Sequence, residues 1–266
     1  MNVPLDSVTL PVILSRTRDV DPSVRKSVYI PALEQLEHPK QLTIAQRELI
    51  VRAGIKDRDQ NVSTAAETLV SSWIDKVNGD IFEFIKLFDF DLSQQDSSPA
   101  EQALLCVLKS RPEILGSLTF PGLLLSLFSK TYTSLNHSRD SFWLEMTPEK
   151  AFLSRVFVEH CILTKDDSRI ESCMPVMTAL AFRIQALYND LLRFIQHKEE
   201  DQVFMSEDNE RSDEVIGKLQ FTLGELIKLA CNMDYADEIG RRKMFALIRK
   251  SSAYTENVGD IYWLHV

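Results

Sequence analysis

The stretch Asp19-Val20-Asp21-Pro22-Ser23-Val24-Arg25 recurs 38 residues later as Asp57-Arg58-Asp59-Gln60-Asn61-Val62-Ser63. An apolar segment with helical periodicity precedes each copy, and another follows it. Self-similarity at an interval of this length is typical of stacked helix pairs, because a single pair cannot bury its apolar face without a neighbour. The duplicated motif therefore predicts an all-α fold, built as an α-solenoid of antiparallel helix pairs.

Capping signals place the helices on both sides of the motif. Asp21 fits an N-cap with Pro22 in the first helical position, and we expect a kink in this helix at Pro31. Thr43-Ile44-Ala45-Gln46 is a capping box that begins the next helix, which we expect to end near Ile55. The helix after the second motif copy carries one continuous apolar stripe: Val62, Ala65, Ala66, Leu69, Val70 and Trp73.

Periodic apolar segments predict further helices at 81–88, 99–108, 121–135, 147–163, 177–195, 215–231 and 240–251. Ser98, which opens a capping box, and Thr147 both precede a proline, as N-caps often do, and both also match a proline-directed phosphorylation site. Between Lys198 and Glu214 there are eight acids and two bases, a composition that predicts an acidic flexible loop at 197–214. We expect residues 1–266 to form a single solenoid segment.

The composition favours a helical intracellular protein. Only 8 of the 266 residues are glycines, which argues against strands joined by Gly-rich turns. Four scattered cysteines without Cys-x-x-Cys spacing predict reduced, buried thiols: Cys106, Cys161, Cys173 and Cys231. No stretch predicts a signal peptide or a membrane span. The acidic segment carries −6 (two bases against eight acids) of the formal net charge of −9, so the overall acidity does not exclude a nucleic-acid partner.

The residues that could carry chemistry also have structural explanations. His160 and Cys161 are adjacent in a predicted helix, where neighbouring side chains point about 100° apart, so they do not form a nucleophile and base pair. The paired aspartates of the motif could hold a metal or act as acid and base, but capping and turn amides explain them better. The other histidines lack ligand-like spacing, and no Gly-rich phosphate loop is present. We therefore predict no catalytic residue, no metal site, no cofactor, no small-molecule substrate and no enzymatic activity.

Basic residues gather in the two repeats that carry the motif: Arg16, Arg18, Arg25, Lys26, Arg47, Arg52, Lys56 and Arg58. Stacked repeats could align some of them into a strip that follows a phosphate backbone. The alternative, which the interspersed acids favour, is an ordinary solvated surface. Arg25 has a further alternative, because an arginine at this place in a solenoid repeat can bridge to an aspartate of the adjacent repeat.

Several sequence blocks, in a constant order, resemble the HEAT-repeat G subunit of condensin, the non-SMC subunit called CAP-G. The most specific block is Leu42-Thr43-Ile44-Ala45-Gln46-Arg47, followed by Gly54-Ile55-Lys56-Asp57-Arg58. Arg16-Thr17-Arg18-Asp19-Val20, Met146-Thr147-Pro148-Glu149 and Gly240-Arg241-Arg242-Lys243 also match. The resemblance covers nearly the whole chain but only an internal stretch of the longer family members, so we expect a fragment. It implies HEAT-like helix pairs in an armadillo-type superhelix.

The resemblance also implies a non-catalytic scaffold. CAP-G subunits bind a segment of the kleisin subunit in the groove of a bent solenoid, and the two together hold double-stranded DNA. The SMC ATPases, reached through the kleisin, compact mitotic chromosomes. We therefore expect these partners, no membrane contact, and a location in the nucleus and on chromosomes, with a cytoplasmic phase in part of the cell cycle. The matched basic positions are the DNA-binding candidates: Arg16, Arg18, Arg25 and Lys26.

Two other functions fit the same fold. Another HEAT-repeat scaffold, such as a nuclear transport receptor or a phosphatase scaffold, would bind proteins without a salt-sensitive DNA contact. An alkylpurine DNA glycosylase on a HEAT-like frame would need an acid facing an aromatic-lined cleft. The three tryptophans, Trp73, Trp143 and Trp263, form no such cluster in the sequence.

Overall fold

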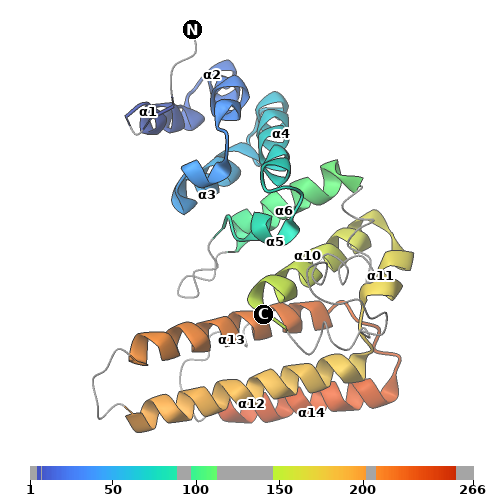
Figure 1. Cartoon of the computed structure of the whole chain (residues 1–266). Helices are drawn as coiled ribbons and strands as arrows, with labels where there is room; N and C mark the ends of the chain where they lie inside the picture. The colour runs from blue at the N-terminus through green and yellow to red at the C-terminus, as the bar shows by residue number, and fades with distance from the viewer. Residues whose placement is uncertain (1–4, 7, 89–96, 113–145, 202–207, 256–266) are drawn as a thin grey trace, which may run out of the picture. The chain divides into compact units, whose positions relative to one another are not determined.

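The computed structural model of the chain describes residues 5, 6, 8–88, 97–112, 146–201 and 208–255 (Figure 1). Every regular element in these ranges is a helix, which confirms the all-α prediction. The predicted helix at 121–135 lies outside the described residues. The chain divides into two compact units, one formed by residues 1–91 and 96–116 and the other by residues 92–95 and 117–266. A single solenoid segment over 1–266 stays a prediction.

The first unit is a stack of helix pairs. Short elements come first: α1 (Thr9–Ser15), η1 (Arg16–Arg18), α2 (Pro22–Ser27), η2 (Val28–Ala32), η3 (Leu33–Gln35) and η4 (Pro39–Gln41). They are followed by α3 (Ile44–Gly54), α4 (Gln60–Lys76), α5 (Ile81–Ile85) and α6 (Ser98–Ser110). A short turn joins α3 to α4, and the two helices pack on each other. Because α4 also contacts α2 and α6, each helix pair leans on its neighbours.

The predicted capping residues begin these helices. The Asp21 side chain accepts a hydrogen bond from the N–H of Ser23 at the start of α2. Thr43 and Gln46 form the predicted capping box at the start of α3, each side chain accepting from the other residue's backbone N–H. The kink at Pro31 is confirmed as well, because the helical backbone breaks at the preceding residue, Ile30, with φ −134° and ψ 117°.

The apolar stripe of α4 forms the core of the first unit. All six predicted residues are buried, and none exposes more than 4% of its surface. The neighbouring helices approach α4 very closely at Gly54, the last residue of α3. A Cβ atom added there would lie 2.4 Å from the Cβ of Ala66 and 2.8 Å from the Cζ of Tyr29. Only glycine lets α3, α4 and η2 meet at this distance.

Substituting Gly54 by alanine is expected to destabilise the first unit by about 2 kcal/mol, because the added methyl group overpacks a rigid contact. Gly224 is a matched control, since it lies within a helix of the second unit and a Cβ there would meet nothing within 4 Å. Gly224→Ala should stabilise the chain by about 0.5–1 kcal/mol through helix propensity. Thermal and urea denaturation measure both changes, and a Gly54→Ala variant as stable as the wild type would refute the close contact.

The second unit contains the longer helices. They are α10 (Pro148–Thr164), α11 (Asp167–Cys173), α12 (Met177–Asp201), α13 (Asp208–Ala230) and α14 (Glu238–Thr255). α13 packs on both α10 and α12, and α14 packs on α12. No helix in the described part of the chain is long and apolar enough to cross a membrane.

The ends of α12 and α13 correct the predicted acidic loop at 197–214. Residues 197–201 are the last turn of α12 and residues 208–214 open α13, which leaves 202–207 outside the described residues. The loop prediction was wrong at both ends because glutamate and lysine are strong helix formers even in a highly charged segment. An ion pair between Glu214 and Lys218, spaced i,i+4, also supports the start of α13.

The two predicted Ser/Thr-Pro helix starts have different outcomes. The Thr147 hydroxyl accepts a hydrogen bond from the N–H of Lys150 at 3.3 Å, so Thr147 is the predicted N-cap of α10. The capping box at Ser98 is wrong, because Ser97 is the N-cap residue and Ser98 is already helical. The Ser98 hydroxyl instead accepts from the side chain of Gln102 at 2.7 Å.

A buried charged cluster links α10 to α13. The Nε atom of Arg155 donates to Glu225 at 2.5 Å, and the side chains are only 4% and 2% exposed. Arg155 also bonds Glu159 at 2.8 Å and lies 5.5 Å from the ring centre of Phe152, while Lys228 bonds the other oxygen of Glu225 at 3.1 Å. The contact between α10 and α13 therefore buries charged side chains that are paired with each other. Leaving one of these buried charges without its partner would be costly in free energy.

Candidate functional site

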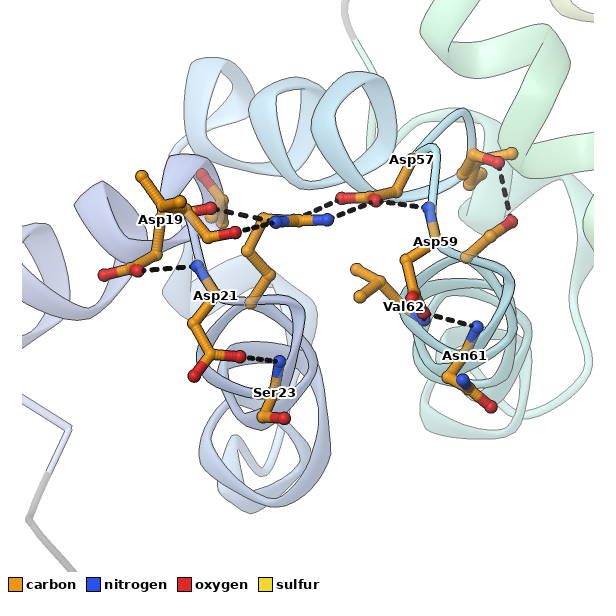
Figure 2. A network of polar contacts seen from close by, with 12 residues as sticks. Asp19, Asp21, Ser23, Asp57, Asp59, Asn61 and Val62 are labelled. Atoms are coloured by element: carbon orange, nitrogen blue, oxygen red, sulfur yellow. Dashed lines mark hydrogen bonds and ion pairs between the residues drawn. The ribbon is translucent and has the colours of Figure 1, made fainter.

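The two copies of the repeated motif form two similar turns. In the first, the Asp19 carboxylate accepts from the N–H of Asp21 at 3.1 Å, and Asp21 accepts from the N–H of Ser23 at 2.8 Å. In the second, Asp57 accepts from the N–H of Asp59 at 2.8 Å, and Asp59 caps α4 (Figure 2). One aspartate of each pair caps a helix and the other satisfies a turn amide, which confirms the structural interpretation of these acids.

Arg25 of α2 joins the two turns. Its Nε and Nη2 atoms donate to the two carboxylate oxygens of Asp57 at 2.7 and 2.8 Å, a bidentate ion pair (Figure 2). Its Nη1 atom donates to the carbonyl oxygens of Asp19 and Val20 at 2.9 and 3.1 Å. The side chains of Arg25 and Asp57 are only 5% and 6% exposed. The predicted bridge between adjacent repeats is confirmed, and the burial of Arg25 contradicts its place among the DNA-binding candidates.

The electrostatics of this pair favour two fixed charges. The hydrogen bond from Arg25 holds the pKa of Asp57 below its usual value, and the same bond raises the pKa of Arg25. Neither group changes its protonation near neutral pH, so the pair cannot act as a general acid or base there. The nearby phenol of Tyr29, in η2, is also buried. Burial raises its pKa, so it stays neutral. The motif therefore fastens two repeats together.

Arg47, in the block most specific to the family, is also buried. It is 6% exposed, and its Nε atom donates to the carbonyl oxygen of Leu87 at 2.6 Å. Its Nη1 atom donates to the carbonyl oxygens of Pro39 and Leu42. Arg47 thus ties α3 to the segments before it and after α5, and it is no part of an exposed basic strip. The signal for this role is its spacing, since Arg47 shares one helix face with three other buried residues: Ile50, Val51 and Gly54.

The remaining DNA-binding candidates are exposed. Arg16 is 61% exposed and pairs with Asp19 at 3.3 Å, while Arg18 and Lys26 also face solvent. Lys56 and Arg58 are exposed beside Asp57 in the second turn. Arg16 and Arg18 lie in η1, directly before the first turn, and Lys26 lies in α2, directly after it. Lys56 and Arg58 lie in the second turn, which Arg25 joins to the first. We call these five exposed residues the basic turn surface: Arg16, Arg18, Lys26, Lys56 and Arg58.

His160 and Cys161 are both buried in α10, with 9% and 1% of their surfaces exposed. Burial lowers the pKa of His160 and raises the pKa of Cys161 to about 12. A thiol with so high a pKa is protonated at neutral pH and is a poor nucleophile. The pair is therefore part of the core.

The alternative of a DNA glycosylase gains no support from Trp73. This residue is 3% exposed and packs against Phe88 with ring centres 6.4 Å apart, so it cannot line a cleft. Trp143 and Trp263 lie outside the described residues. Among the residues that the structure describes, no group of three or more histidine, cysteine, aspartate or glutamate side chains is placed to hold a metal ion.

Stacked helix pairs fastened by buried charges define a helical-repeat protein. The chain has homologues named condensin complex subunit 3. It is 28% identical over 270 aligned positions to the Schizosaccharomyces pombe protein, covering 100% of this chain and 26% of that protein. The Saccharomyces cerevisiae and human proteins are 27% and 26% identical, over 96% and 91% of this chain and 22% of each relative. The chain thus spans about a quarter of its relatives' length.

Solved structures support the same fold. The chain resembles one in a crystal structure of the S. pombe condensin Cnd3–Cnd2 subcomplex, with a TM-score of 0.74 and 27% identity. The match covers 94% of this chain and 28% of the solved chain. This likeness confirms the prediction of an all-α solenoid. No protein-family model matches the chain.

Proposed function

We propose that this chain is a non-catalytic scaffold segment of a condensin complex, which binds the kleisin subunit and, through it, the SMC ATPases. The observation that carries the proposal is the match of 94% of the chain to a protein solved in complex with its partner, Cnd2. The buried roles of Arg25, Arg47, His160 and Cys161 agree with a scaffold, because these groups stabilise helices. A nuclear and chromosomal location follows from the same proposal.

Binding of the kleisin is tested by co-purification. The chain is mixed with tagged S. pombe Cnd2, the partner in the similar structure, and the mixture is passed over an affinity column and a sizing column. We expect the two proteins to elute together. A chain that is folded by circular dichroism and still elutes apart from Cnd2, and from the kleisin of its own organism, would contradict the proposal.

We further propose that the basic turn surface contacts DNA phosphates. Each phosphate contact contributes about −0.9 to the slope of log affinity against log salt concentration. Replacing Arg16, Arg18 and Lys26 by glutamine should therefore weaken DNA binding and flatten this slope by up to about 3, as measured by fluorescence anisotropy with a DNA duplex at several salt concentrations.

A matched control removes the same charge elsewhere in the first unit. Lys40, Arg52 and Lys86 are also exposed but lie outside the basic turn surface, so their replacement by glutamine should leave the salt slope nearly unchanged. Equal effects of the two triple variants would rule out the basic turn surface as a DNA site. The absence of any salt-dependent DNA binding, with Cnd2 still bound, would favour a scaffold that binds proteins alone.

A further inference from the structure

An apolar cavity of about 100 Å³ lies between α12, α13 and α14 of the second unit. Side chains from all three helices line it, among them Tyr188, Ala230 and Met244. The cavity opens to solvent beside Cys231 and Ile248, which line it and are exposed. An engineered apolar cavity of about 150 Å³ binds benzene, so this smaller one has room for a single side chain of the size of leucine.

Exposed apolar side chains border the mouth of the cavity. Phe245 and Ile248, three residues apart on α14, are 50% and 45% exposed. The ring centre of Phe245 lies 6.5 Å from that of Tyr235, which also lines the cavity. The Tyr235 hydroxyl donates to the carbonyl oxygen of Ala230 at 3.1 Å, and Arg241 donates to the carbonyl oxygen of Tyr235 at 3.3 Å. Large apolar side chains that stay exposed together are typical of a surface that binds a partner.

The helix that carries this border is strongly basic. Residues 239–250 include five bases and no acid, although the whole chain has a net charge of −9. Arg242 and Arg249 precede and follow Phe245 by three and four residues, so they lie beside it on the helix surface, and both are exposed. Arg242 pairs with Glu238, but both side chains are largely exposed, so another carboxylate can replace that partner. The charge around the cavity therefore favours a negatively charged partner.

An acidic peptide suits both features of this surface. Its carboxylates can bond the arginines, and one apolar side chain can enter the cavity. A DNA phosphate backbone would pair with the arginines but has no side chain to fill the cavity. A second copy of this chain, related by a two-fold axis, would place the basic helix α14 against itself.

We propose that the surface formed by Arg242, Phe245, Ile248 and Arg249 binds an acidic segment of a partner protein, with one leucine-sized side chain of that segment in the cavity. We call these four residues the α14 docking surface. The proposal concerns the second unit alone and does not depend on binding of the kleisin or of DNA.

The chemistry of the partner is tested with a phage-displayed peptide library, random at every position, which is selected on the full chain. We expect the selected peptides to be acidic and to share one leucine, methionine or phenylalanine. At saturation they should slow the alkylation of Cys231 by a maleimide about tenfold or more, because Cys231 lies at the mouth of the cavity. A selection that yields no peptide, or peptides that are not acidic or leave Cys231 equally reactive, would overturn the proposal.

The role of the cavity is tested with a variant that fills it. Ala230→Leu adds a side chain to the cavity wall and should weaken binding of the selected peptide about tenfold or more, as measured by fluorescence anisotropy. Ala186→Leu, at an exposed position of α12, is the matched control and should bind as the wild type does. If Ala230→Leu fails to fold, replacing the apolar residue of the peptide by alanine should cause the same loss in the wild-type chain. Unchanged binding in either measurement would overturn the proposal.

The role of the arginines is tested in the same way. Arg242→Gln/Arg249→Gln should weaken peptide binding about tenfold or more. Arg193→Gln/Lys218→Gln removes the same charge from side chains that are 73% and 52% exposed elsewhere in the unit, and it should have little effect. Loss of binding in the first variant, together with full binding by Ala230→Leu and displacement of the peptide by a DNA duplex, would overturn the proposal in favour of a DNA contact.

Discussion

Replacing Asp57 by alanine is expected to lower the free energy of unfolding of the first unit by about 3 kcal/mol. The substitution leaves the buried guanidinium of Arg25 with only carbonyl oxygens as partners, and it removes the acceptor for the N–H of Asp59. Removing one member of a buried ion pair costs more than the pair itself contributes, because the remaining charge stays away from water. Urea denaturation followed by circular dichroism measures the change.

Asp19 is the matched control, because it has the same place in the first copy of the motif. Its partner Arg16 is 61% exposed, so no buried charge is left unpaired and Asp19→Ala should cause a much smaller loss of stability than Asp57→Ala. Similar losses of stability in the two variants would show that burial does not make the ion pair between Arg25 and Asp57 more stabilising than the one between Arg16 and Asp19.

The stabilisation by Asp57 should depend on pH with a defined sign. Because Arg25 holds the pKa of Asp57 below the value of about 4 in an unfolded chain, the ionised carboxylate stabilises the fold. This contribution is complete above about pH 4 and is lost as the pH falls through the lower pKa of the folded state. The stability difference between the wild type and Asp57→Ala should thus be constant near neutral pH and shrink in acid.

A second large loss of stability is expected from a substitution in the charged cluster between α10 and α13. Glu225→Ala should lower the free energy of unfolding of the second unit by about 3 kcal/mol, because Arg155 is 4% exposed and loses its buried partner. Lys228 loses its partner in the same substitution. Urea and thermal denaturation measure the loss.

Two further variants separate burial from charge at this seam. Glu159 bonds the same guanidinium but is 33% exposed, so Glu159→Ala should cost about 1 kcal/mol or less. Replacing the buried pair with Arg155→Met and Glu225→Leu together should be nearly neutral, since apolar side chains of similar size need no partner. A double variant as unstable as Glu225→Ala would contradict this explanation.

The helices and the motif turns could be predicted from the sequence because their signals are local. Asp21, Asp59 and Thr43 bond backbone groups two or three residues away, and the stripe from Val62 to Trp73 depends only on helical periodicity. The acidic segment was assigned wrongly because composition alone does not distinguish a charged loop from a charged helix end.

The buried arginines were harder to predict because their partners are distant in the sequence. Arg155 and Glu225 are 70 residues apart, and Arg47 and Leu87 are 40 apart, so no short-range pattern joins them. Arg25 was an exception, since the repeat interval itself indicates that the two turns lie side by side. The same burial explains why only part of the predicted basic strip is exposed.

The central claim is that Arg25 and Asp57 fasten two adjacent repeats, and a double-mutant cycle tests it most directly. The stabilities of Arg25→Ala, Asp57→Ala and the variant with both substitutions are measured by urea denaturation. If the two side chains stabilise the stack by bonding each other, the double variant should lose no more stability than either single variant, because it leaves no unpaired buried charge. Losses that simply add would contradict the account, because they would mean that the two residues act independently.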